Sequence, residues 1–287
     1  MALADKVAIV TDSICCLPRE MVEQYKITIV PISILIGEKI YRDGIDLTAD
    51  EAYQFFLKDP SAFKTSPASV ASYMEAFHQA SKVADNILCI SLSSGISTGY
   101  DMSRVAKEQA KTDLPGVKIE VMDSQNVLAS EGFIVLAAAR AVASGKSLKG
   151  AVAAAEEVKS KATFYLVLET LKHVFRTGRI PRVASQVGSM LGVKPIFTVS
   201  SGVVQFAGAV RNKLHGIDRI LALMYEKVGT ARVHVAVMHA YAREEAEALK
   251  ERVAAEFDCA ELWLTELSPV VGYALGTGTV GCAFYGE

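Results

Sequence analysis

The 287-residue sequence has few of the residues from which redox and metal sites are built. Its five cysteines contain no C-x-x-C pair, and its five histidines include no H-E-x-x-H spacing. Cys15 and Cys16 are adjacent, which is poor geometry for a mutual disulfide, and the odd number of cysteines gives no disulfide framework. We therefore expect reduced thiols in a cytoplasmic protein, with no metal site and no cofactor.

The sequence also lacks an excess of one charge and a long apolar run. The formal net charge of −2 gives no bulk attraction to nucleic acid or to an anionic membrane surface. The longest apolar stretch, Gly132–Ala139, is much shorter than the about 20 residues that a transmembrane helix needs, and the N-terminus has no signal-peptide pattern. Because 51% of the residues are hydrophobic, we predict a globular protein. The small net charge and the lack of a long apolar run predict no nucleic-acid partner and no integral membrane association.

Short apolar runs alternate with amphipathic stretches in the first half of the chain. Pro31 lies inside one of these runs and indicates an edge strand or a bend there. The expected strands are Val7–Val10, Ile27–Ile36, Ile87–Leu92 and Val117–Met122, and the expected helices are Pro18–Tyr25, Ala49–Lys58, a helix opened by Ser66-Pro67, Tyr100–Lys111 and Ala129–Ser144. This alternation predicts an α/β fold with a parallel sheet and helices on both of its faces.

A polar stretch at Lys159–Ala162 marks an expected domain boundary. We predict an N-terminal α/β domain, residues 1–160, and a C-terminal α/β domain with a mixed sheet, residues 161–287. Ser201-Gly202 is expected to join two C-terminal strands as a hairpin. The expected strands of this half are Phe164–Leu168, Pro195–Val199, Val203–Val210, Val233–Met238, Leu262–Leu264 and the end of Gly276–Tyr285, and the expected helices are Leu171–Thr177, Val183–Leu191, Ile217–Lys227 and Glu244–Phe257.

Hydroxyl or acidic side chains follow three strands of the first half, at Thr11-Asp12-Ser13, Ser93-Ser94-Gly95 and Asp123-Ser124-Gln125. In open parallel sheets ligands bind at the carboxyl ends of the strands. We therefore expect these three loops to line one crevice.

Two predicted helix starts also carry hydroxyl side chains, at Thr65-Ser66-Pro67 and at Ser97-Thr98. Free backbone N–H groups and the helix dipole at such a start favour a carboxylate or a phosphate. Ordinary N-capping requires the same residue types, so the spacing alone does not decide between the two roles. If these hydroxyls bind an anion, one alternative is a protein that binds a small carboxylate or phosphate.

The segment Gly95–Gly99 fits the G-x-S-x-G pattern of serine hydrolases, in which the serine lies between a strand and a helix. The order serine, acid, histidine is available as Ser97, Asp218 and His239. However, the sequence has no H-G-G-G oxyanion loop, and no acid is fixed near His239 by spacing. We therefore predict a protein that is not an enzyme and has no catalytic residue, and we keep a serine acyl hydrolase using Ser97 as the alternative.

Two segments of the second half are further candidates. The densest basic cluster, Arg176–Arg182, contains Arg179 and is either a solvated loop or an arginine clamp for an anion, and Arg211 adds to the basic character of this half. The segment Val271–Gly281 is rich in glycine and is expected to be a tight loop that opens no helix.

Taken together, these segments resemble the DegV family of bacterial fatty-acid-binding proteins. SSGISTGY resembles the family's S-S-x-L-S-G-T-Y motif with the Gly-Thr pair inverted, and KTSP falls where the family has T-S-Q-P. The matching segments are Ala8–Ser13, Lys64–Pro67, Ser93–Tyr100, Val121–Ser124, Thr177–Ile180, Gly192–Pro195, Val210–Lys213 and Gly272–Gly281.

The resemblance implies two α/β domains with a long-chain fatty acid, of about 14 to 18 carbons, buried between them. It also implies that Thr65 and Ser97 hydrogen-bond the carboxylate, and that a separate fatty acid kinase phosphorylates the bound acid to an acyl-phosphate. Arg211 matches the family arginine that serves this kinase step, whereas Ala274 stands where the family has histidine. The expected ligand-binding residues are Thr65, Ser66, Ser94, Ser97, Arg179 and Arg211.

Overall fold

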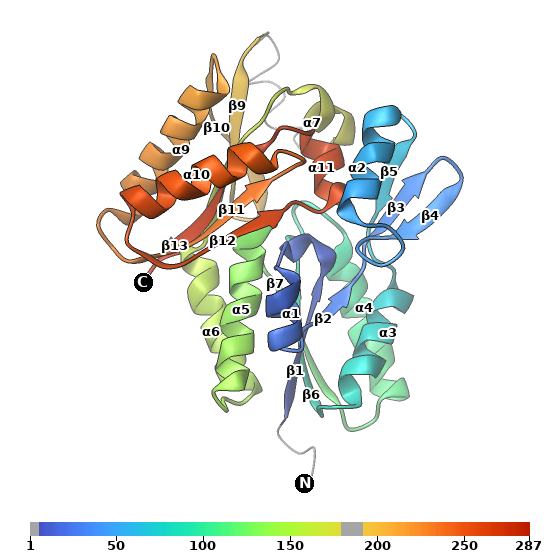
Figure 1. Cartoon of the computed structure of the whole chain (residues 1–287). Helices are drawn as coiled ribbons and strands as arrows, with labels where there is room; N and C mark the ends of the chain where they lie inside the picture. Colours follow the sequence, from blue (N-terminus) through green and yellow to red (C-terminus); the bar gives the residue numbers. More distant parts are fainter. Residues whose placement is uncertain (1–5, 179–191) are drawn as a thin grey trace.

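The computed structural model describes residues 6–178 and 192–287, and in these residues the strands form three sheets (Figure 1). A four-stranded parallel sheet has the order β2-β1-β6-β7 and consists of β1 (Val7–Asp12), β2 (Thr28–Val30), β6 (Asn86–Ser91) and β7 (Lys118–Asp123). Helices α3 (Val70–Ser81) and α4 (Gly99–Asp113) pack on one face of it, and α5 (Ala129–Ala143) and α6 (Leu148–Lys161) pack on the other. The short helix α1 (Arg19–Gln24) joins β1 to β2.

A six-stranded mixed sheet forms the second half of the molecule, in the order β10-β9-β8-β13-β11-β12. Only β11 and β12 run parallel, and the other described pairs are antiparallel. Helices α9 (Lys213–Val228) and α10 (Arg243–Glu256) cover one face of it. Its strands are β8 (Thr163–Val167), β9 (Lys194–Ser200), β10 (Val203–Val210), β11 (Val233–His239), β12 (Cys259–Glu266) and β13 (Val280–Gly286), and the short helices α7 (Lys172–Thr177) and α11 (Pro269–Leu275) lie at its end.

Helix α5 lies between the two large sheets, in contact with β1 of one and with β8 and β13 of the other. Its sequence, ASEGFIVLAAARAVA, is apolar on all sides, and most of its side chains are buried. A helix that is apolar all round is one that is covered all round. The apolar run Gly132–Ala139 is therefore explained by this central position, and no described helix is long and apolar enough to cross a membrane.

The third sheet was not expected from the sequence. It has the order β4-β3-β5, is built from β3 (Ser33–Ile36), β4 (Lys39–Arg42) and β5 (Phe63–Ser66), and packs with α2 (Ala49–Lys58). The single strand expected at Ile27–Ile36 is two strands in different sheets, and Pro31 lies at the bend between them. Proline has no backbone N–H to donate to a neighbouring strand, so a change of chain direction at Pro31 loses few of the hydrogen bonds of the sheet.

Several expected elements have other bounds in the structure, and two of them bear on the site. The helix expected to open at Ser66-Pro67 begins at Val70, and Ser69 Oγ caps it by accepting the Ser72 N–H at 3.1 Å. Thr65 and Ser66 instead extend β5, because they pair with Ile34 and Ser33. The expected loop Val271–Gly281 overlaps helix α11, which Ser268 caps and Pro269 opens. The expected helix Val183–Leu191 lies outside the described residues.

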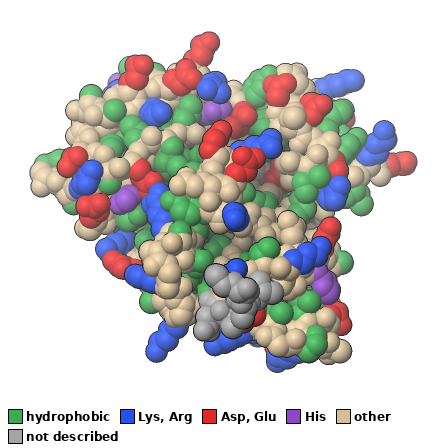
Figure 2. Space-filling view, turned by 60° about the horizontal axis from the view of Figure 1, so that its bottom comes forward, with side chains coloured by type: hydrophobic (Ala, Val, Ile, Leu, Met, Phe, Trp, Pro, Cys, Tyr) green, Lys and Arg blue, Asp and Glu red, His purple; other side chains and the backbone are tan. Residues whose placement is uncertain are grey.

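The prediction of an α/β fold with a parallel N-terminal sheet and a mixed C-terminal sheet is confirmed. The division at residue 160 stays a prediction, and the largest apolar cluster includes residues of both halves, such as Ile90 and Phe197. On the face shown in Figure 2, acidic and basic side chains are interspersed, as expected for a net charge of −2.

Candidate functional site

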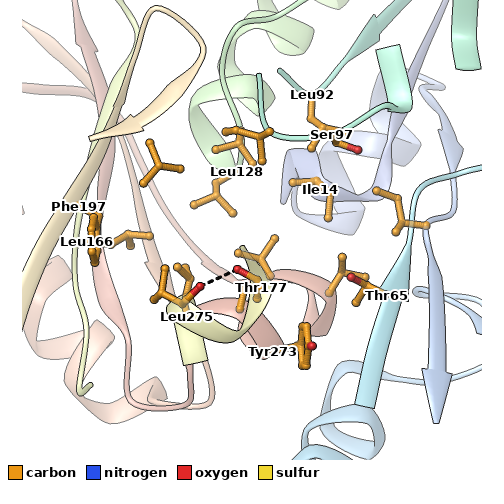
Figure 3. Close-up of a pocket in the computed structure, with 18 of the residues that line it drawn as sticks. Ile14, Thr65, Leu92, Ser97, Leu128, Leu166, Thr177, Phe197, Tyr273 and Leu275 are labelled. Atoms are coloured by element: carbon orange, nitrogen blue, oxygen red, sulfur yellow. Dashed lines mark hydrogen bonds between the residues drawn. The ribbon is translucent and has the colours of Figure 1, made fainter. Parts of the chain in front are cut away.

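A pocket lies between the two large sheets and receives side chains from both halves of the chain (Figure 3). It holds about 930 Å³ of space not filled by atoms, part of it open to solvent. Its apolar lining consists of Ile14, Ile32, Pro67, Leu92, Ile96, Val127, Leu128, Phe164, Leu166, Val174, Phe197, Val204, Val270, Val271, Ala274 and Leu275.

The polar side chains of the described lining are hydroxyls: those of Thr65, Ser66, Ser97, Thr177 and Tyr273. Among the described residues that line the pocket there is no lysine, arginine, histidine or carboxylate. In Figure 3 Thr65 and Tyr273 lie at one end of the pocket, and Leu166 and Phe197 lie at the other. The pocket is therefore an apolar space with hydroxyl groups gathered toward one part of its wall.

Ser97 is positioned by the loop that joins β6 to α4. Asp12 anchors the start of this loop, because its carboxylate accepts the Leu92 N–H at 2.9 Å. The Ser97 N–H donates to the Ser93 carbonyl at 3.1 Å, and Ser97 Oγ accepts the Gly99 N–H at 3.2 Å. Ser97 thus lies at a helix start, as its sequence predicts.

Gly99, the second residue of the inverted Thr98-Gly99 pair, is closely packed. A Cβ at position 99 would lie 3.3 Å from a methyl carbon of Leu92 and 3.4 Å from the Tyr73 hydroxyl. The contact with Leu92 is slightly tighter than an ordinary van der Waals contact and that with Tyr73 is at its lower limit, so a Cβ here requires Leu92 to shift by a few tenths of an ångström.

Thr65 reaches the pocket from the opposite side, at the end of β5. Strand side chains alternate between faces, so Thr65 shares a face with Phe63, whereas Lys64 lies on the other face and is exposed. The Phe63 ring stacks on the Tyr273 ring with centroids 5.5 Å apart. This aromatic pair fixes the strand end that carries Thr65 beside α11.

The structure does not bring all the expected ligand-binding residues to the pocket. Ser94 lies outside the described lining, and its hydroxyl donates to Asp123 Oδ2 at 2.6 Å, which ties the loops after β6 and β7 together. Arg211 is exposed beyond the end of β10 and is also not part of this lining. Arg179 lies outside the described residues.

A contact joins the β9–β10 hairpin to the loop after β6, two elements that line the pocket, and sequence reasoning missed it. The hairpin itself was expected, and its tip brings the Gly202 carbonyl to Ser93 Oγ, which donates to it at 2.6 Å. Gly95 allows this approach, because a Cβ there would lie 2.4 Å from the Gly202 oxygen. We call this contact between Ser93, Gly95 and Gly202 the hairpin clasp.

Two buried carboxyl groups support the loops from beneath. Burial raises the pKa of Asp12 to about 6 although its carboxylate accepts two backbone N–H groups. Burial, together with the nearby charge of Asp12, raises the pKa of Glu131 on α5 well above its usual range. Neither residue lines the pocket. The expected loop Thr11-Asp12-Ser13 contributes to it indirectly, because Ile14, the next residue, lines the pocket and Asp12 holds Leu92, another lining residue.

The residues of a hydrolase triad are not brought together. Asp218 accepts from Arg252 at 2.7 Å on the exposed side of α9. His239 lies in a different depression, beside Tyr241 and Glu266, and burial lowers its pKa to about 4. Ser97 has no positive φ of the kind that marks a strained turn, and it lies in the loop of residues 92–98 between β6 and α4, whereas a nucleophile elbow is a sharp strand-to-helix junction.

Comparison with known proteins relates the whole chain to one family. The model of the DegV family, whose members are described as uncharacterised, matches residues 6–287. Protein DegV of Bacillus subtilis is 28% identical over 277 residues, which cover 96% of this chain and 97% of that protein. A DegV domain-containing protein of Streptomyces coelicolor is 30% identical over 277 residues, which cover 96% of each chain.

Solved structures agree with this assignment. The crystal structure of DegV from Bacillus subtilis, described as a fatty acid binding protein, has a TM-score of 0.90 at 28% identity and covers 99% of this chain and 100% of that chain. A stearic acid-binding protein from Eubacterium ventriosum has a TM-score of 0.88 at 26% identity, with 98% of each chain covered. The chain thus shares its fold with DegV proteins that bind fatty acids.

Proposed function

The chain belongs to the DegV family, and on this premise we propose that it binds a long-chain fatty acid in the pocket between its two large sheets. The observation that carries the proposal is the lining: apolar side chains along most of the wall, with hydroxyls of Thr65 and Ser97 reaching it from different elements. The fatty acids named for its structural relatives support the choice of ligand.

The tail accounts for most of the affinity in this proposal. Each buried methylene contributes about 0.8 kcal/mol, so a tail of ~15 methylenes contributes roughly 12 kcal/mol before the costs of ordering and association. Leu128, Leu166 and Phe197 offer apolar contact along the wall. A short polar ligand would leave this surface without a partner, which favours a lipid over a small carboxylate.

The hydroxyls hold the carboxylate and fix its direction. A serine hydroxyl has one donor and two acceptor positions. Because Ser97 Oγ uses an acceptor position for the Gly99 N–H, its O–H is available to donate to a carboxylate. A hydrogen bond to a charged group contributes about 1.5–3 kcal/mol. We assign this role to Thr65 and Ser97, with Ser66 beside them.

The test is the binding of a defined fatty acid to Thr65→Ala and Ser97→Ala, measured by isothermal titration calorimetry. Each substitution is expected to raise the Kd of palmitic acid about tenfold or more, because one charge-assisted hydrogen bond is lost. Ser81→Ala, which removes an exposed hydroxyl of α3, is the matched control and is expected to leave the Kd unchanged. Mass spectrometry of the solvent-extracted protein is expected to find a long-chain fatty acid, and unchanged affinity in both pocket variants would refute the head-group assignment.

We further propose that the protein carries its ligand and is not an enzyme. The absence of a base among the described lining residues supports this, since Ser97 would need one to act as a nucleophile. Turnover of p-nitrophenyl esters, together with covalent labelling of Ser97 by a fluorophosphonate probe, would favour the serine acyl hydrolase instead.

Presentation of the bound acid to a fatty acid kinase is the last part of the proposal. The kinase would transfer the terminal phosphoryl group of ATP to a carboxylate oxygen, giving an acyl-phosphate and ADP, which implies a cytoplasmic location. Ala274, in place of the family histidine, lines the pocket. We expect weak acyl-phosphate formation with a cognate kinase and an increase with Ala274→His. Full activity without the substitution would show that the histidine is dispensable.

A further inference from the structure

A fatty acid carboxylate in this pocket needs a positive charge that the described lining does not contain. Thr65, Ser66 and Ser97 can donate hydrogen bonds, but they are neutral. Moving an ionised carboxylate from water into a largely apolar site is unfavourable unless an opposite charge lies near it. The following inference rests on the proposed function and asks which cation supplies that charge.

Arg176, at the end of α7, is the described cation most closely tied to the pocket wall. Its guanidinium carbon lies 4.6 Å from the centroid of the Tyr273 ring and 6.0 Å from that of Phe56. Tyr273 lines the pocket, and so does Thr177, the residue that follows Arg176. A guanidinium this close to an aromatic ring is held by a cation–π interaction, which limits where the charge can move.

Tyr273 also connects Arg176 to the part of the wall that carries Thr65. The Tyr273 ring stacks on Phe63 at 5.5 Å, and Phe63 shares a strand face with Thr65. Figure 3 shows Tyr273 and Thr65 at the same end of the pocket. The charge of Arg176 is therefore held at the end where a hydroxyl is assigned to the carboxylate.

Of the other cationic side chains near the pocket, two lysines pair with glutamates and one histidine is uncharged, whereas Lys64 lies on the face of β5 opposite to that of Thr65. Lys194 pairs with Glu169, and Lys213 pairs with Glu169 and Glu245. His173, on the same helix as Arg176, packs on Phe56 at 5.2 Å, and burial lowers its pKa, so it is neutral at pH 7. No described carboxylate forms an ion pair with Arg176, whose charge is available to a ligand.

We propose that Arg176 is the positioning residue for the head group: held over the Tyr273 ring beside the pocket wall, it supplies the positive charge that makes the site select an ionised carboxylate over a neutral head group of the same chain length. Arg176 is exposed, so its attraction is partly screened by solvent and salt. The tail and the hydroxyls provide affinity, and Arg176 provides the preference for the anion.

The test compares myristic acid with myristyl alcohol, which have the same number of carbons and differ in head-group charge. Titration calorimetry at low ionic strength is expected to show that Arg176→Gln raises the Kd of the acid about five- to tenfold and leaves the Kd of the alcohol unchanged. Arg176→Lys, which keeps the charge, is expected to restore most of the affinity for the acid. Added salt is expected to weaken acid binding by the wild type more than by Arg176→Gln.

Arg219→Gln, which removes an exposed arginine of α9 paired with Glu226, is the matched control and is expected to change neither Kd. An equal loss of affinity for acid and alcohol would show that Arg176 only supports the pocket wall at Tyr273, and no loss would show that it takes no part; either result overturns this inference. Failure of the wild type to bind any fatty acid would overturn the proposed function itself, which keeps the two failures distinguishable.

Discussion

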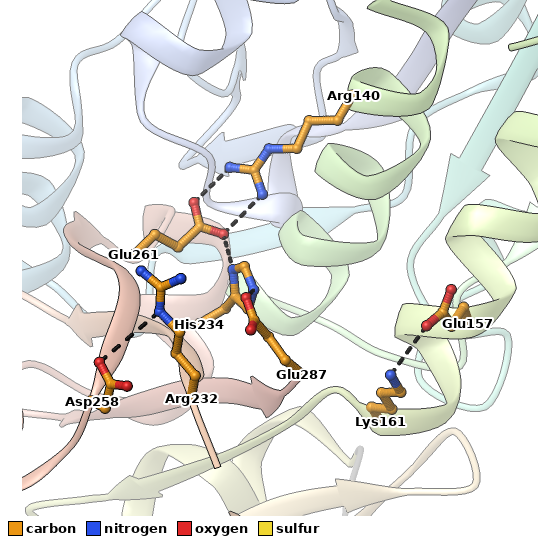
Figure 4. A network of polar contacts seen from close by, with 8 residues as sticks. All are labelled: Arg140, Glu157, Lys161, Arg232, His234, Asp258, Glu261 and Glu287. Carbon is orange, nitrogen blue, oxygen red and sulfur yellow. Dashed lines mark hydrogen bonds and ion pairs between the residues drawn. The ribbon is translucent and has the colours of Figure 1, made fainter. Parts of the chain in front are cut away.

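At the scale of single residues, Glu261 joins the central helix to the six-stranded sheet (Figure 4). Both of its oxygens accept from Arg140 of α5, one at 2.9 Å, and one oxygen lies 2.7 Å from His234 Nδ1. Burial alone would raise the pKa of Glu261, but the hydrogen bonds from His234 and Arg140 outweigh it and lower the pKa to about 2. The charged form of Glu261 therefore stabilises the folded state.

This gives a prediction for the dependence of stability on pH. Because the pKa of Glu261 is lower in the folded state than its usual 4.5, its contribution is complete above pH 4.5 and is lost as the pH falls toward about 2. We expect Glu261→Gln to lower the free energy of unfolding at pH 7 by about 1–3 kcal/mol. The difference from wild type should shrink between pH 4.5 and pH 2, measured by urea denaturation.

Glu256→Gln is the control for this series, since Glu256 pairs with Arg252 on the exposed side of α10. The pKa of Asp12 is raised to about 6, so its effect on the free energy of unfolding changes with pH in the opposite direction. Asp12 is present in the wild type and in both variants, so this effect cancels from their differences in stability. A difference between Glu261→Gln and wild type that stays constant with pH would contradict the role of the charged pair.

At the scale of elements, the β9–β10 hairpin forms a wall of the pocket, and a contact with a residue far away in the sequence holds it in place. Phe197 and Val204 of the hairpin line the pocket, and the hairpin clasp fixes its tip to the loop that carries Ser97. Ser93 Oγ is buried; it donates to the Gly202 carbonyl and accepts the Gly95 N–H at 3.2 Å. One hydroxyl thus holds two elements together.

We expect Ser93→Ala to loosen the hairpin without unfolding the protein. Loss of the hydroxyl leaves the buried Gly202 carbonyl without its donor, which costs about 1–3 kcal/mol. Hydrogen exchange followed by mass spectrometry should show faster exchange in residues 194–210, with little change in β11 and β13. The exposed-site variant Ser81→Ala should exchange like the wild type, and uniformly faster exchange over the whole of Ser93→Ala would argue against a local role for the clasp.

At the scale of the whole molecule, an apolar pocket between the two large sheets is lined by residues of both halves of the chain. Thr65 and Tyr273 lie at one end, and Phe197 lies at the other, 2% exposed and edge-on to Phe206 with ring centroids 6.1 Å apart. If the carboxylate is held near Thr65, the tail extends toward Phe197. The distance between these ends then sets the chain length that fits.

Phe197→Leu should therefore shift the preference toward longer fatty acids. A smaller side chain at the tail end admits additional methylenes, and each one that becomes buried contributes about 0.8 kcal/mol, roughly a fourfold change in Kd. The measurement is the rise of the melting temperature with saturated fatty acids of increasing length. Phe257→Leu, at the end of α10 and away from the pocket, serves as control, and an unchanged length preference in Phe197→Leu would place the tail end elsewhere.

Much of this organisation is present in local sequence patterns. The periodicity of Ala49–Lys58 and of Val203–Val210 predicts those elements with their observed bounds, and the hydroxyls after Ile87–Leu92 indicate the loop that carries Ser97. These features depend on turn chemistry and on residues a few positions apart, which a sequence displays directly. Thr65 became a candidate because it was expected at the start of a helix, whereas in the structure it lies in strand β5 and opens no helix.

The sequence by itself thus determined the α/β alternation, the hairpin at Ser201-Gly202 and the candidate hydroxyls Thr65 and Ser97. The tertiary structure decided what no local pattern carries: the clasp between Ser93 and Gly202, 109 positions apart, the placement of Arg176 on Tyr273, and the pocket itself. The physical reason is that the residues of an apolar cavity are of the same kinds as those of a packed core. Whether Leu128 and Phe197 fill a core or line a pocket depends on how the two sheets and α5 pack together.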